Sequence, residues 1–99
     1  MDEEQSAAAF MAAVEQIRRQ SQQLTATGAA ILLAIHLDIA TDSRSIANRL
    51  GLAHALVLRE IAALSPRFVR VTKRDARTQR SFLEATAEGQ ALAGSSSRI

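Results

Sequence analysis

Cysteine is absent from this 99-residue chain, and its only aromatic side chains are three phenylalanines. Without cysteine the chain has no disulfide framework, no thiolate nucleophile and no soft ligand for a metal ion. The phenylalanines suit hydrophobic packing better than stacking on nucleic-acid bases. The two histidines, His36 and His54, fall on different predicted helices, so we expect no metal site.

Motifs for catalysis and for membrane insertion are also missing. There is no Ser/His/Asp arrangement, paired-carboxylate motif or glycine-rich phosphate loop, so we expect neither an enzyme nor a bound cofactor. The longest apolar stretch, residues 29–39, is about half the roughly 20 residues that span a bilayer. The first residues are acidic, whereas a secretory leader is basic. These features predict a cytoplasmic protein that makes no membrane contact.

Positive charge is present, and it is concentrated in one segment. The net charge is only +2, but residues 67–80 contain six arginine or lysine residues and a single acid, Asp75. Residues 1–24 have the opposite balance, with four acids against two arginines. A cluster of one sign favours contact with a polyanion, although a solvated strand pair would also accommodate it.

The N-terminal segment, residues 4–24, contains good helix formers and neither glycine nor proline, which predicts one long helix. Its apolar positions recur at alternating spacings of three and four residues, which places them in one narrow seam. The pattern does not decide between packing on the rest of the chain and packing on a second copy. From Phe10 onward the seam positions are Phe10, Val14, Ile17, Ser21 and Leu24.

Three further helices are predicted before the only proline. Residues 29–39 form an apolar helix typical of a protein core, on which His36 is a core or boundary residue. Asp42 is the best N-cap for a short helix that ends at Gly51, and residues 52–64 resume a helical pattern. Because Pro66 cannot continue the helical hydrogen-bond ladder, this fourth helix ends before it.

After Pro66 the apolar spacing changes to two residues, the pattern of β-strands. Residues 68–73 and 81–83 are predicted to be short strands, joined by the polar segment 74–79 into a hairpin with a basic tip. Thr86 is a suitable cap for a last helix over residues 87–93. The serine-rich segment 94–99 is expected to be disordered.

This order of elements predicts a mostly α-helical α+β fold, a winged helix-turn-helix with an extra N-terminal helix. We expect a dimerisation helix at residues 1–25, a DNA-binding domain at 26–93 and the disordered tail at 94–99. In such a fold the helix over 52–64 is the recognition helix, whose N-terminal end enters the major groove of double-stranded DNA. The 67–80 hairpin is the wing, which lies along the flanking backbone.

Four sequence signals in this order resemble the MarR-type winged helix regulators. They are SIANRLGL at 45–52, the helix at 57–64, the segment from Phe68 to Asp75-Ala76-Arg77, and LEATAEG at 83–89. The resemblance implies a homodimeric transcriptional regulator in which Arg77 reaches into the minor groove. That family usually builds its dimer from long helices after the wing. Here the chain ends about ten residues after the wing's exit, so the N-terminal seam is expected to form the dimer.

The predicted recognition helix has few hydrogen-bonding groups for reading bases. Only His54 and Arg59 are placed to meet base edges, so we expect weak discrimination and an affinity dominated by phosphate contacts. If Leu56 and Leu58 were exposed, they would instead mark a protein-contact surface. A small-molecule effector would have little room in so short a chain. The expected DNA contacts are Arg44, Arg49, His54, Arg59, Arg70, Lys73, Arg74, Arg77 and Arg80.

Overall fold

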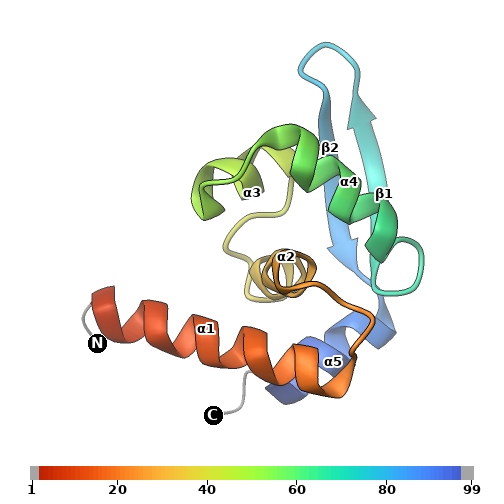
Figure 1. The fold of residues 1–99 in the computed structure, drawn as a ribbon. Helices are drawn as coiled ribbons and strands as arrows, with labels where there is room; N and C mark the ends of the chain where they lie inside the picture. The colour runs from red at the N-terminus through yellow and green to blue at the C-terminus, as the bar shows by residue number, and fades with distance from the viewer. Residues whose placement is uncertain (1–2, 97–99) are drawn as a thin grey trace.

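The structure, a computed structural model, describes residues 3–96 and divides them into five helices and one antiparallel hairpin (Figure 1). This is the mostly helical α+β, winged helix-like fold that the sequence predicts. In chain order the elements are α1 (Glu3–Gln20), α2 (Ala26–His36), α3 (Ser43–Leu50), α4 (His54–Leu64), β1 (Val69–Asp75), β2 (Arg80–Ala85) and α5 (Ala87–Ser96).

Helix α2 forms the centre of the core. Ile31, Leu32 and Leu33 are completely buried, and α2 packs against α1, α4, α5 and β2. A helix that is surrounded on all sides needs no polar face, which explains its nearly continuous apolar sequence. Within residues 3–96, no helix has both the length and the apolar character that a membrane crossing requires.

The start of α2 is fixed by a local cap. The Thr25 hydroxyl accepts a hydrogen bond of 2.9 Å from the Gly28 backbone N–H, which satisfies one of the donors that a helix leaves unpaired at its N-terminus. Helix α2 therefore spans Ala26–His36, three residues earlier at each end than the sequence predicted. The last residues of the predicted helix, 37–39, form an exposed loop.

The apolar seam of α1 packs inside the chain. Val14 and Ile17 have no exposed surface and Leu24 is buried, while Phe10 is partly buried against the same core. Helix α1 also ends at Gln20 rather than at residue 24. Of the dimer interface predicted at Phe10, Val14, Ile17, Ser21 and Leu24, the residues Val14, Ile17 and Leu24 are therefore corrected, because the core of the same chain already covers them, whereas Phe10 and Ser21 are half-buried.

The helix-turn-helix formed by α3 and α4 follows its local signals. Asp42 is the N-cap of α3, and its carboxylate accepts a hydrogen bond of 3.0 Å from the Ser45 backbone N–H. Gly51 ends α3 with a φ of 67°, in the left-handed region that glycine adopts at little cost. Both positions agree with the sequence prediction, and they orient α4, which begins at His54.

The hairpin is joined to the helix-turn-helix through β2. Ahead of α3, the Leu83 backbone N–H donates a hydrogen bond of 2.8 Å to the Thr41 carbonyl, and Asp42 forms an isolated bridge with Phe82. Residues 41–42 thus lie beside β2 and form an isolated bridge with it, which the sequence did not predict. Helices α2 and α5 also pack on β2, so β2 holds the hairpin on the body.

Helix α5 continues beyond its predicted end. Thr86 caps it as expected, by accepting a hydrogen bond of 3.0 Å from the Gly89 backbone N–H. The helix extends through Ser96, whose hydroxyl is buried between Gln20 and the Leu92 carbonyl. Residues 94–96 are therefore helical instead of part of a disordered tail, because this contact anchors them on α1. Residues 97–99 lie outside the described range.

Candidate nucleic-acid interface

The start of α4 and the turn of the hairpin lie at the end of the molecule opposite α1 and α5 (Figure 1). Helix α4 rests on the body through Val57, Ile61 and Leu64, which are buried. Its outer face exposes Arg59 among alanines, at positions 55, 62 and 63. The helix is therefore not sealed in the core, and in its first turn Ala55 is exposed while His54 and Leu56 are half-buried.

The tip of the hairpin carries exposed positive charge. Arg74 and Arg77 are exposed. The Asp75 carboxylate accepts a hydrogen bond of 3.0 Å from the Arg77 backbone N–H, a local arrangement that stabilises turns. Lys73 is also exposed, and its ammonium lies 5.7 Å from the centre of the Phe82 ring. The tip is thus an ordered basic turn.

The nine predicted DNA contacts separate into three groups. Within residues 3–96, no ion pair involves Arg49, Arg59, Lys73, Arg74 or Arg77, all of which are exposed. Arg70 is exposed but paired with Glu84 on the neighbouring strand. The remaining three, Arg44, His54 and Arg80, are half-buried and bonded within the chain.

Arg44 and Arg80 hold the wing against α3. The Arg44 Nε donates a hydrogen bond of 3.1 Å to the Thr78 carbonyl in the hairpin turn. The Arg80 Nε lies 3.3 Å from the Asp42 carboxylate, close enough for an ion pair but without the alignment of a hydrogen bond. These two arginines were predicted as phosphate contacts, and the structure shows that each already has a partner within the chain.

A buried serine connects the same region to α4. Ser43 has no exposed surface. Its hydroxyl oxygen accepts a hydrogen bond of 2.9 Å from the Ser81 backbone N–H and lies 2.9 Å from the His54 Nε2. Sequence reasoning did not single out Ser43, because a serine one residue after an N-cap has no local signal for contacts 11 and 38 residues away.

Two pKa values in this cluster are shifted. Burial lowers the pKa of His54 below its ordinary value, and the charges of Arg44 and Arg80 lower it further against the smaller opposing effect of Asp42. Burial raises the pKa of Asp42, but the hydrogen bonds from Ser45 and the charge of Arg80 together outweigh it, so this pKa is lowered. Both shifts favour a neutral His54 beside an ionised Asp42 near neutral pH.

Arg67, at the base of the hairpin, contributes charge to the sequence cluster but not to the wing tip. Its guanidinium pairs with Glu88 at 2.6 Å and donates to the Gln23 side chain at 2.8 Å. It also lies 4.8 Å from the centre of the Phe68 ring. These contacts tie the hairpin base to α5 and to the α1–α2 loop.

The apolar residues of α4 do not form an exposed patch. Leu56 and Leu58 are half-buried. In the described part of the chain the exposed large hydrophobic residues are Met11, Leu37 and Ile39, on α1 and on the loop after α2. The condition that would favour a protein-contact surface on α4, exposure of both leucines, is therefore not met.

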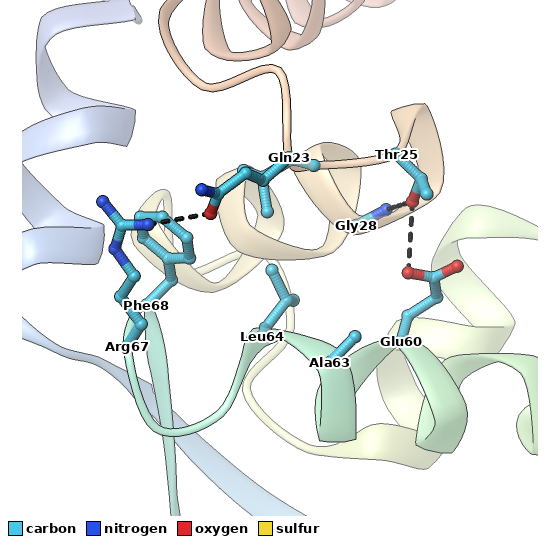
Figure 2. Close-up of a pocket in the computed structure, with 9 residues that line it drawn as sticks. Gln23, Thr25, Gly28, Glu60, Ala63, Leu64, Arg67 and Phe68 are labelled. Carbon is cyan, nitrogen blue, oxygen red and sulfur yellow. Dashed lines mark hydrogen bonds between the residues drawn. The ribbon is translucent and has the colours of Figure 1, made fainter.

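A small pocket lies between the start of α2 and the end of α4, and Figure 2 shows its lining. Its volume is about 120 Å³, below the roughly 300–1,000 Å³ typical of small-molecule sites. Its polar groups already have partners: the Thr25 hydroxyl donates to Glu60 at 3.1 Å, and Gln23 accepts from Arg67. The pocket gives no support to an effector site.

Comparisons with protein-family models, with curated proteins and with solved structures found no match to this chain. In the described range no group of three His, Asp or Glu side chains is arranged to hold a metal ion.

Proposed function

We propose that this protein binds double-stranded DNA, with the N-terminal end of α4 in the major groove and the β1–β2 wing on the flanking backbone. One observation supports this most: exposed arginines of the wing tip, Arg74 and Arg77, lie at the same end of the molecule as the first turn of α4. A helix end and a basic hairpin at one end of the molecule are suited to contact a groove and its neighbouring phosphates.

The exposed face of α4 indicates that the affinity of such a protein for DNA and its sequence specificity would come from different residues. Arg59 is the one hydrogen-bonding side chain among the alanines of that face, whereas base discrimination requires several donors and acceptors at groove edges. Arg49 of α3 and the wing residues Lys73, Arg74 and Arg77 are exposed cations suited to phosphates. The protein would therefore bind duplexes mainly through phosphate contacts and discriminate weakly between sequences.

We further propose a cytoplasmic transcriptional regulator of the MarR type, acting as a homodimer. The order of elements and the Asp75–Arg77 wing tip support the type. The dimer contact would use the surface that α1 leaves exposed, because Met11 is 54% exposed and the N-terminal end of α1 projects beyond α2 and α5 (Figure 1).

The test of DNA binding is a charge deletion at the wing tip. In the Arg74→Ala/Arg77→Ala variant two phosphate contacts are lost, so the negative slope of log affinity against log salt should become shallower by about 2. Fluorescence anisotropy with a mixed-sequence duplex at several salt concentrations measures this slope. The matched control is Arg18→Ala/Arg19→Ala, which removes the same charge from the exposed face of α1. Equal slopes for the two double variants would contradict the proposal.

A further inference from the structure

We propose that Ser43 is a positioning residue for DNA binding, which holds the wing at a fixed angle to the recognition helix without touching DNA. This inference rests on the proposed function. Ser43 lies at the first turn of α3 with no exposed surface. From there its single hydroxyl contacts both halves of the DNA-binding surface, Ser81 of the wing and His54 of α4.

The direction of one of these two hydrogen bonds is determined by the groups present. The Ser81 backbone N–H can only donate, so the Ser43 oxygen accepts from it. The hydroxyl proton of Ser43 is then available to the His54 Nε2, 2.9 Å away. When that proton is donated to Nε2, His54 is a neutral acceptor with its own proton on Nδ1. The lowered pKa of His54 favours the neutral ring.

Neighbouring contacts extend this link along the wing. Thr41 and Asp42 lie beside β2, the Asp42 carboxylate faces Arg80, and Arg44 reaches the Thr78 carbonyl in the turn. Residues 41–44 thus contact the hairpin at positions that extend from Leu83 on β2 to Thr78 in the turn. We name residues 41–44 the wing clasp.

The wing depends on this clasp because β1 gives it little support. Strand β1 packs mainly on β2, and β2 carries the contacts with α2, α3 and α5. The contacts nearest the tip, at Thr78, Arg80 and Ser81, are those made by the clasp. Without them the basic tip would move relative to α4, and fewer of its arginines would meet phosphates in one bound geometry.

Ser96 provides a matched control, because it is another buried serine that makes two hydrogen bonds. Its hydroxyl accepts from Gln20 at 3.1 Å and donates to the Leu92 carbonyl at 3.0 Å, in α5 at the opposite end of the molecule. Ser43→Ala and Ser96→Ala each remove one hydroxyl and no charge. A merely structural effect would lower the unfolding temperature in both variants and leave the salt dependence of DNA binding unchanged.

The first measurement is the salt dependence of duplex binding. We expect Ser43→Ala to make the negative slope of log affinity against log salt shallower by about 2, as the loss of two wing phosphate contacts would. Ser96→Ala should keep the wild-type slope. A wild-type slope in Ser43→Ala would overturn the inference and leave DNA binding itself intact, whereas absence of binding by the wild-type protein would instead overturn the proposed function.

The second measurement does not require DNA. Because the chain contains no cysteine, Ala55→Cys on α4 and Ala76→Cys in the wing turn allow two spin labels to be attached at exposed positions. The distance distribution between the labels should be narrow in the parent and in Ser96→Ala, and broad in Ser43→Ala. An unchanged distribution would overturn the inference. If Ser43→Ala does not fold, Arg44→Met, which removes the contact with Thr78 at a half-buried position, is measured in the same way.

Discussion

At the scale of single residues, His54 couples protonation to folding. Burial and the two nearby arginines lower its pKa in the folded protein, whereas the unfolded chain binds a proton at the ordinary value of about 6.5. Between these values the unfolded state binds more protons than the folded state. The free energy of unfolding therefore falls as the pH decreases below about 6.5, and it levels off below the folded pKa.

Urea unfolding between about pH 7.5 and about pH 5 measures this effect. The wild-type protein should lose stability across that window, and His54→Gln, which retains an acceptor for Ser43, should lose less. Asp42 does not interfere, because its lowered pKa makes its contribution disappear only as the pH falls below its ordinary value of 3.8. An identical loss in the variant would show that His54 is not the group responsible.

Residue identity alone could not separate DNA contacts from internal partners. Arg44 and Arg80 look the same in sequence as Arg74 and Arg77, yet the first pair is engaged by Thr78 and Asp42. These contacts join residues 34 and 38 positions apart, respectively. A charge count therefore predicts where positive potential lies but not which side chains are committed to the fold.

At the scale of elements, local signals were enough for the helix-turn-helix. The side chain of Asp42 and the left-handed Gly51 act within one turn of α3, so both could be predicted from neighbouring residues. The isolated bridge between Asp42 and Phe82 of β2 could not, because it depends on how the hairpin folds back. The same limit applies to α1, where periodicity predicts a seam but not whether the partner is the same chain.

The prediction at this scale concerns helix α1, whose exposed surface is proposed to form the dimer contact. Met11→Asp places a charge on the exposed surface of its projecting half, and should convert a dimer into a monomer in light scattering while changing the free energy of unfolding by less than about 1 kcal/mol. Ala26→Asp, at an exposed position in the first turn of α2, adds the same charge and should leave the mass unchanged. A wild-type mass for Met11→Asp would remove this surface from the account.

At the scale of the whole molecule, positive charge and apolar surface are partly separated. Of the exposed basic residues that make no ion pair within residues 3–96, Arg19 lies on α1 and the others lie on α3, α4 and the wing, whereas the exposed large hydrophobic residues lie on α1 and the loop after α2. Such a separation leaves one end suited to a polyanion and another suited to a protein surface. The overall layout was predictable from the order of elements, since each helix cap and the change of period at Pro66 are local features.

A titration of the wild-type protein with a mixed-sequence duplex, at about 50 mM and about 200 mM salt, tests the central claim most directly. If Arg49, Lys73, Arg74 and Arg77 each neutralise one phosphate, the salt slope is about −3.6 and the affinity per bound chain falls about 150-fold over this range. No association at the lower salt concentration, or an affinity that does not change with salt, would contradict the account.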